Sequence, residues 1–209
     1  MTTLYGGGRV KVFGLCGVSG SGKGAVSTCF LRRGIPSVDT DAVYHDITSK
    51  PSPCLDELAK RYGKTIISES GALRRDVLGE IVFADGAALS DLNAITHKYI
   101  LAEARKVIKE KGELGIPFIL IDAPLLFESG FDRECDGVIA VVADLDLRIA
   151  RICERDGITE EAARRRISRQ TSDDFLVSHA DYVIENNGTP AELEVRVLEV
   201  YADIMKNIF

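Results

Sequence analysis

The chain has 209 residues, of which 45% are hydrophobic and 28% are charged, fractions that exclude a collagen-like, low-complexity or largely disordered protein. The net charge of −6 argues against binding of nucleic acid through overall positive charge, and no apolar run approaches the roughly 20 residues that span a bilayer. The five cysteines include no C-x-x-C pair and the N-terminus lacks the apolar core of a signal peptide, so we expect a cytoplasmic protein.

Short apolar segments alternate with helical patterns along much of the chain. We predict strands over residues 9–16, 35–39, 116–121, 137–143 and 181–185. A helix over 22–33 that ends near Gly34 follows the first strand, and a helix that begins with a Thr189–Glu192 capping box follows the last. Strands separated by helices predict an α/β fold with a mostly parallel sheet between helices.

Residues 44–112 interrupt this alternation. They show helical patterns near 54–62, 74–83 and 87–111, and at most one short strand over 65–68. We therefore predict a helical insertion between the second and third strands.

A phosphate-binding motif follows the first predicted strand. Residues 17–23 read Gly-Val-Ser-Gly-Ser-Gly-Lys, which matches G-x-x-x-x-G-K at the start of a helix. In such a loop backbone N–H groups and the helix N-terminus bind phosphates, and Lys23 reaches the β- and γ-phosphate oxygens. The Ser or Thr that normally follows, and whose hydroxyl contacts Mg²⁺, is replaced by Gly24. A water ligand is one substitute for that hydroxyl, and loss of function is the alternative.

Carboxylates follow two of the predicted strands, at the end where ligands of parallel sheets bind. Asp39 and Asp41 close the second strand, and Asp122 ends the third, in the form of a strand that helps to hold a metal. Asp41 could orient an acceptor hydroxyl and take its proton. For Asp39 and Asp41 the alternative is an N-cap of the next helix.

Seven arginines are concentrated in one short segment: Arg148, Arg151, Arg155, Arg164, Arg165, Arg166 and Arg169. On a flap, arginines could close over ATP and stabilise the transferring phosphoryl group. Acidic residues are interleaved with them, which favours a solvated helical face for most of the seven and a functional role for one or two.

Further motifs occur in a fixed order over nearly the whole chain. They are Val-Asp-Thr-Asp (38–41), Gly-Ala-Leu-Arg-Arg (71–75), Ile-Thr-His (95–97), Ala-Pro-Leu-Leu-Phe-Glu (123–128) and Ala-Asp-Tyr-Val-Ile with Asn-Asn-Gly (180–188). Together with the phosphate loop, they make the chain resemble the dephospho-coenzyme A kinase family from about Val12 to Gly188.

The resemblance implies a P-loop kinase fold, in which a five-stranded parallel sheet is flanked by helices. It implies a nucleotide-binding core over 9–43 and 113–209, a helical acceptor domain over 44–112 and a lid over 148–172. The implied enzyme phosphorylates the ribose 3′-hydroxyl of 3′-dephospho-coenzyme A with ATP and Mg²⁺, giving coenzyme A and ADP in the last step of coenzyme A synthesis. Its expected partners are small molecules, without nucleic acid or membrane.

Site residues are carried over by position from the same resemblance. It implies that Asp41, Lys23 and the lid residue Arg166 are catalytic. It places ATP at Ser19, Gly20, Ser21, Gly22, Lys23, Gly24, Ala25, Asn186 and Asn187. It places the acceptor at Asp41, Arg75, His97 and Leu125, and the metal at Asp39 and Asp122.

Four positions depart from the family pattern. Gly24 lacks the usual hydroxyl, Arg74 replaces an acidic residue, Lys98 replaces a proline and Arg148 replaces a glutamine. Two alternative hypotheses stay open: a P-loop kinase for another small acceptor, and a non-catalytic ATP-binding protein. The acceptor motifs disfavour the first alternative, and only Gly24 favours the second.

Overall fold

The computed structural model describes residues 10–208. The chain separates into two compact units. One, the core unit, contains the chain up to Val38 and from Ile108 onwards, and the other, the insertion unit, is Asp39–Val107. None of the helices within residues 10–208 combines the length and the apolar character needed to span a bilayer.

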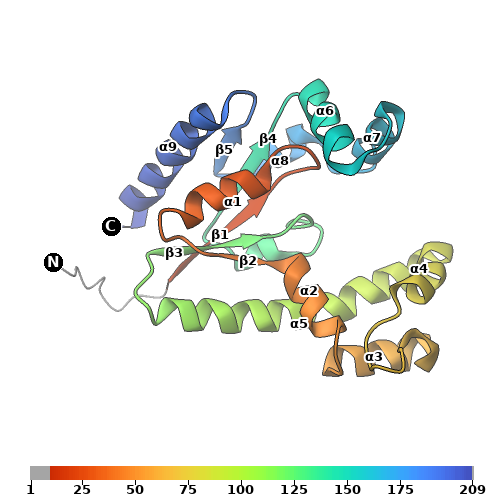
Figure 1. The fold of residues 1–209 in the computed structure, drawn as a ribbon. Helices are drawn as coiled ribbons and strands as arrows, with labels where there is room; N and C mark the ends of the chain where they lie inside the picture. Colours follow the sequence, from red (N-terminus) through yellow and green to blue (C-terminus); the bar gives the residue numbers. More distant parts are fainter. Residues whose placement is uncertain (1–9, 209) are drawn as a thin grey trace. The chain divides into compact units, whose positions relative to one another are not determined.

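A five-stranded sheet forms the centre of the core unit. The strands are β1 (Lys11–Cys16), β2 (Ser37–Asp39), β3 (Phe118–Asp122), β4 (Gly137–Val142) and β5 (Tyr182–Glu185). Their order across the sheet is β2-β3-β1-β4-β5 (Figure 1). β1 pairs in parallel with β3 and β4, and β4 pairs in parallel with β5. The five predicted strands are therefore confirmed, with bounds that differ by one or two residues.

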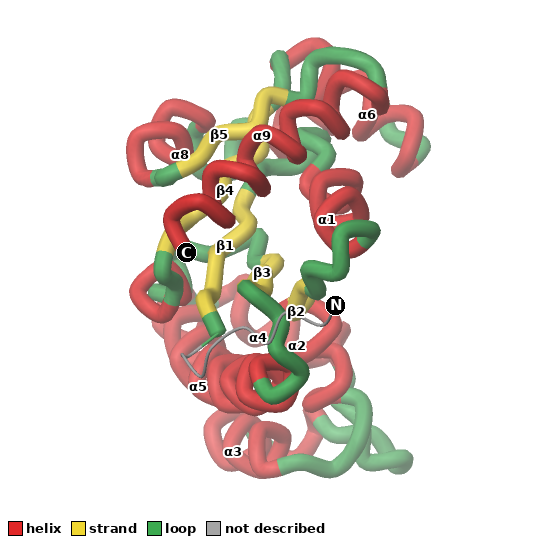
Figure 2. The backbone as a smooth tube through the Cα atoms, turned by 90° about the vertical axis from the view of Figure 1, so that its left-hand side faces the viewer, coloured by secondary structure: helices red, strands yellow, loops and turns green. Residues whose placement is uncertain are grey.

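Helices cover both faces of this sheet. α1 (Lys23–Leu31) and α9 (Pro190–Ile208) lie on one face and α8 (Asp173–His179) on the other (Figure 2), and the unit also contains α6 (Leu145–Asp156), α7 (Glu160–Ile167) and a short 3₁₀ helix η2 (Phe131–Glu134). α1 and α9 pack in one apolar cluster with alternate residues of the strands. The cluster includes Phe30 of α1, Val197 of α9, Leu15 of β1 and Ile139 of β4. Figure 2 shows α8 on the opposite side of the sheet from α1. The period of two along each strand thus supplies apolar side chains to both layers.

Local signals explain where two of these helices begin and end. The Thr189 N–H donates to Glu192 Oε2 at 2.6 Å, and the Glu192 N–H donates to Thr189 Oγ1 at 3.3 Å, so the predicted capping box of α9 is confirmed. α1 ends at Leu31, two residues before its predicted end. Gly34, at φ +79°, then turns the chain toward β2.

The insertion unit is helical. It contains α2 (Thr40–Thr48), α3 (Pro53–Tyr62), a 3₁₀ helix η1 (Lys64–Ile66), α4 (Arg75–Ala84) and most of α5 (Gly86–Gly112) (Figure 1). Residues 65–68, the one segment where the sequence left room for a short strand, form no strand. Ile66 is buried from within the 3₁₀ turn, and only Ile67 makes a β-bridge, to Leu73. The 3₁₀ turn is favoured over a strand because it buries the Ile66 side chain.

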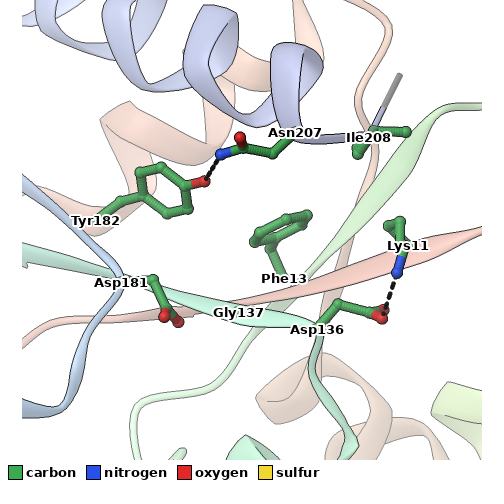
Figure 3. Close-up of a pocket in the computed structure, with 8 residues that line it drawn as sticks. All are labelled: Lys11, Phe13, Asp136, Gly137, Asp181, Tyr182, Asn207 and Ile208. Carbon is green, nitrogen blue, oxygen red and sulfur yellow. Dashed lines mark hydrogen bonds and ion pairs between the residues drawn. The ribbon is translucent and has the colours of Figure 1, made fainter.

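Two aspartates connect the strand starts in the same way. The Asp136 N–H donates to the Val12 carbonyl at 2.7 Å, and its Oδ2 accepts the Val12 N–H at 2.9 Å. The Asp181 N–H donates to the Val138 carbonyl at 2.9 Å, and its Oδ2 accepts the Val138 N–H at 2.8 Å. Both line a cavity of about 230 Å³ at the amino ends of β1, β4 and β5 (Figure 3). These contacts set the register that positions the opposite, carboxyl ends of the strands.

Candidate active site

The predicted phosphate loop, residues 17–23, joins β1 to α1. Gly20 and Gly22 have φ values of +81° and +90°, in the left-handed region that glycine adopts without strain. A Cβ on Gly20 would lie 2.7 Å from the Arg148 carbonyl oxygen, so the loop and α6 approach closely only because this position has no side chain. The glycines of the motif therefore fit both the turn and its packing.

Side chains hold the outer surface of the loop. The carbonyl oxygens of residues 19–21 each accept a hydrogen bond, in chain order from Arg148 Nε at 3.1 Å, Arg151 Nη1 at 3.2 Å and Asn186 Nδ2 at 2.8 Å. In a planar trans peptide the C=O and the next N–H point in opposite directions. The N–H groups of residues 20–22 therefore point away from these donors. The Ser21 N–H donates to the Val18 carbonyl at 3.1 Å, and the N–H groups of Gly20 and Gly22, together with the N-terminus of α1, form an arrangement suited to a phosphate.

Lys23 and Asp122 form an ion pair between the start of α1 and the end of β3. Both side chains are largely buried. Asp122 lies opposite Leu15 in the parallel pairing of β1 and β3, which places it at the same edge of the sheet as the loop. The structure thus brings together the lysine and one of the two carboxylates predicted for the metal.

The Cys16 thiol ends β1 immediately before the loop. Burial raises the pKa of this thiol to about 12. At neutral pH Cys16 is therefore protonated, and it supplies no thiolate beside the phosphate loop.

The residues expected at the metal fit an ion held largely by nucleotide and water. Within residues 10–208 no group of three or more His, Cys, Asp or Glu side chains could hold a metal by itself. Asp39 Oδ1 caps α2, accepting the N–H groups of Asp41 at 2.9 Å and Ala42 at 3.1 Å. Mg²⁺ in kinases commonly uses one or two carboxylates plus phosphate oxygens and waters, and Asp122 suits that role. A Cβ on Gly24 would meet no atom within 4 Å, so this position has room for a water.

Asn186 and Asn187, expected near ATP, have well-defined partners in the core unit. Asn186 is buried, and besides its bond to the loop its carbonyl accepts from Arg151 Nη2 at 3.0 Å. Asn187 exchanges two hydrogen bonds with Asp144, each 2.8 Å long. Asn186 therefore supports the phosphate loop, and the contact of these two residues with ATP stays a prediction.

Arg166 lies in α7, within the segment predicted to be the lid. It forms an ion pair with Asp156, the last residue of α6. Asp156 also accepts two hydrogen bonds from Arg155, at 2.7 and 2.9 Å. Hydrogen bonds from Arg155 and Arg166 hold the pKa of the Asp156 carboxyl well below its usual range. Arg166 therefore has an ion-pair partner within the same predicted segment.

Three further arginines of the predicted lid segment differ in their partners. Arg164 and Arg165 pair with Glu160 and Glu161 one turn earlier, which confirms the expected pairing with interleaved acids. Arg148 is different, because its side chain is buried and reaches the phosphate loop.

Three of the four residues expected at the acceptor lie in the insertion unit. Asp41 is exposed in the first turn of α2, and Tyr44 follows three residues later on the same helix face. The Arg75 guanidinium lies over the Tyr44 ring, 5.5 Å from its centroid, so Arg75 is next to that face. Burial lowers the pKa of His97 on α5. Leu125 belongs to the core unit, where it is exposed just after β3.

Comparison with known proteins agrees with this arrangement. The model of the dephospho-CoA kinase family matches residues 11–192. The chain belongs to this family. A dephospho-CoA kinase from Corynebacterium glutamicum is 37% identical over 195 residues, which cover 93% of this chain and 98% of the relative. One from Fusobacterium nucleatum is 36% identical, covering 90% and 95%.

Solved structures share the fold. The Thermus thermophilus protein TT1252 superposes with a TM-score of 0.78 at 28% identity, covering 94% of this chain and 98% of that one. A dephospho-CoA kinase from Campylobacter jejuni gives a TM-score of 0.70 at 24% identity, covering 95% and 98%. The P-loop kinase fold expected for this dephospho-CoA kinase family member is therefore confirmed.

The support of the loop by Arg148 and Arg151 was not predicted from the sequence of this family member. One signal was available. Arg148 lies four residues before Ile152 and next to Ile149, on the buried side of α6. An arginine on an apolar helix stripe indicates a buried, partnered guanidinium rather than a solvated one.

Proposed function

We propose that this protein transfers the γ-phosphoryl group of ATP to the ribose 3′-hydroxyl of 3′-dephospho-coenzyme A, giving coenzyme A and ADP. The observation that carries the proposal is membership of the dephospho-CoA kinase family over residues 11–192. The phosphate loop and its Lys23–Asp122 ion pair support it, because they supply the groups that a P-loop kinase uses on ATP.

In this proposal Asp41 orients the acceptor hydroxyl and accepts its proton. The 3′-oxygen then forms a bond to the γ-phosphorus, and the bond from that phosphorus to the β–γ bridging oxygen breaks. Lys23, the N–H groups of Gly20 and Gly22 and Arg166 balance the negative charge of the transferring group and of the leaving ADP. Catalysis is mainly positioning and electrostatics, because the hydroxyl and the phosphate need only be held in line.

The acceptor contacts follow from side-chain chemistry. Arg75 carries a planar guanidinium that suits the phosphate groups of the acceptor. His97, with its pKa lowered by burial, supplies a neutral ring for hydrogen bonding, and Leu125 supplies an apolar contact. Loop support at the nucleotide side is provided by Asn186.

We assign the metal to Asp122 rather than Asp39, because Asp39 caps α2. When bound with ATP, Mg²⁺ would neutralise phosphate charge. We also propose that the enzyme acts in the cytoplasm. In support, all five cysteines are free, as expected where thiols are kept reduced.

The experiment mixes purified protein, ATP, Mg²⁺ and 3′-dephospho-coenzyme A and measures coenzyme A by mass spectrometry. Asp41→Asn removes the proton acceptor and should lower kcat by about 10²–10⁴-fold, the usual contribution of a general base. Asp46→Asn is the matched control, because Asp46 is exposed on the same helix and pairs with Lys50 at 2.7 Å. Its turnover should stay close to that of the parent.

Each other result has a defined meaning. ATP binding without coenzyme A would favour another acceptor or a non-catalytic role. Equal losses in Asp41→Asn and Asp46→Asn would remove Asp41 from the catalytic role.

A further inference from the structure

Residues 170–173, which follow α7 and reach the first residue of α8, contact three parts of the core unit. Gln170 contacts the phosphate loop, Thr171 Oγ1 donates to Glu128 after β3, and Asp173 pairs with Arg148 of α6. The segment lies directly after the helix that carries Arg166. It therefore continues the chain from α7 and is joined to groups at the nucleotide site by hydrogen bonds and an ion pair.

Two of these contacts converge on a single residue of the loop. The Ser19 N–H donates to Gln170 Oε1 at 3.1 Å. The Ser19 carbonyl accepts from Arg148 Nε at 3.1 Å, and Arg148 Nη1 binds Asp173 Oδ2 at 2.6 Å. Ser19 is thus bound on both sides by residues 170–173, directly on one side and through an arginine on the other.

The contact through Arg148 and the contact with Gln170 differ in strength and in burial. Arg148 is 4% exposed and its bond to Asp173 is between charged groups, whereas Gln170 is exposed and is a neutral acceptor. Bonds between charged groups are about twice as strong as neutral ones. The Gln170 bond is therefore the one that an arriving ligand can break, while the loop carbonyls stay held.

A phosphate is the ligand suited to break it. The N–H groups of a P-loop bind phosphate oxygens, and the Ser19 N–H is the loop donor immediately before that of Gly20, so a bound phosphate brings an oxygen atom close enough to compete for it. A phosphate oxygen is a charged acceptor and competes well against an amide oxygen for the same N–H.

We propose that Gln170 is a positioning residue that competes with the nucleotide for the Ser19 N–H. In the nucleotide-free enzyme the amide oxygen of Gln170 occupies this donor and restrains residues 168–172. Binding of ATP replaces that oxygen by a phosphate oxygen and releases the segment next to α7. This inference rests on the proposed function, because it requires that the loop binds ATP.

Two substitutions at one position have opposite expected effects. Gln170→Ala removes the competing acceptor, so the Kd for ATP should fall by roughly two- to tenfold, the range for a neutral hydrogen bond. Gln170→Glu keeps an acceptor of the same length and adds negative charge beside the phosphate, so the Kd should rise. Because Gln170 is exposed, neither change removes core packing.

The test titrates ATP with Mg²⁺ into parent and variants by calorimetry, with a thermal unfolding scan of each ligand-free protein. Ser168→Ala is the control, because Ser168 Oγ donates to the Arg165 carbonyl at 3.1 Å, beside α7, and its ATP affinity should match the parent. Hydrogen exchange provides a second readout. Residues 168–172 should exchange faster in ligand-free Gln170→Ala than in the ligand-free parent.

The outcomes separate this inference from the proposed function. A parent that binds no ATP would overturn both. A parent that binds ATP while Gln170→Ala binds it equally or more weakly would overturn the competition alone. Unchanged exchange over 168–172 in Gln170→Ala would show that the contact does not restrain the segment.

Discussion

Arg166 of α7 and Asp156 at the end of α6 form an ion pair across the turn between the two helices. The turn itself depends on Gly157, at φ +64°. Because both partners of the pair retain solvent contact, the pair adds little to stability, and its effect is to restrict where the Arg166 guanidinium lies. A restrained guanidinium loses less conformational freedom when it binds a phosphoryl group.

Arg166→Ala should lower kcat by on the order of 10³-fold or more, the range for an arginine that stabilises phosphoryl transfer. Arg165→Ala is the matched control, since Arg165 is the adjacent residue and pairs with Glu161 at 2.5 Å on an exposed face. Its kcat should remain within about twofold of the parent, as for a surface ion pair. Steady-state assays of coenzyme A formation measure both. Similar losses in the two variants would contradict a specific role for Arg166.

Two substitutions of Gly24 separate an effect on helix stability from an effect of a hydroxyl on Mg²⁺ binding. It is exposed in the first turn of α1, and a Cβ there would meet no atom within 4 Å. Gly24→Ala and Gly24→Ser should both raise the free energy of unfolding, by up to about 1 kcal/mol, because glycine in a helix loses more backbone entropy. Only Gly24→Ser adds a hydroxyl, so only it should lower the Mg²⁺ concentration for half-maximal activity. Activity against Mg²⁺ and urea unfolding measure these quantities, and an equal shift in both variants would exclude the hydroxyl as the cause.

Arg74 occupies the N-cap of α4, where it makes no capping hydrogen bond. Arg74→Asp should raise the free energy of unfolding by about 1 kcal/mol, because a carboxylate at the N-cap accepts an otherwise unpaired helix N–H. The interactions of the Arg74 guanidinium that this substitution removes are weak, at 3.4 Å to the Thr65 carbonyl and 3.9 Å to Asp76. Arg74→Ala removes the same two interactions without adding a cap, so urea unfolding of the two variants isolates the cap. Equal free energies of unfolding for Arg74→Asp and Arg74→Ala would refute the capping effect.

His97 should make stability depend on pH. Burial lowers the pKa of His97 in the folded protein below its ordinary value of 6.5. The unfolded chain then binds a proton more readily than the folded one, so the free energy of unfolding should fall as the pH drops through 6.5 toward the folded pKa. Above pH 6.5 the contribution of His97 to the free energy of unfolding is fully present.

His97→Gln should flatten that part of the profile in urea unfolding series at several pH values. His45→Gln, at an exposed histidine on α2, is the control and should keep the slope of the parent. A parent profile that is level between pH 7 and pH 5 would contradict the effect.

The nucleotide side of the site could be predicted because its signals are local. A strand, a glycine-rich loop and a helix follow one another in the chain, and Asp122 ends a second apolar strand. Parallel strands place their carboxyl ends at one edge, so the proximity of Lys23 and Asp122 follows from two short segments.

Contacts between distant segments could not be predicted in this way. Arg148 and Arg151 lie among acidic residues, and this composition also describes a solvated helix. Their contacts depend on how α6 packs against Gly20, which is far from them in the sequence. α8 was also not predicted, since its seven residues are too few to show a helical period.

The matched hydrogen bonds of Asp136 and Asp181 have a consequence for assembly of the sheet. Each aspartate binds both the N–H and the C=O of one residue on the neighbouring strand. If β5 joined β4 one residue out of step, Asp181 would lose both bonds, and the fully buried Ile184 would move to the other face. Mispaired intermediates are thereby disfavoured during folding, and Asn186 reaches the phosphate loop only in the correctly paired sheet.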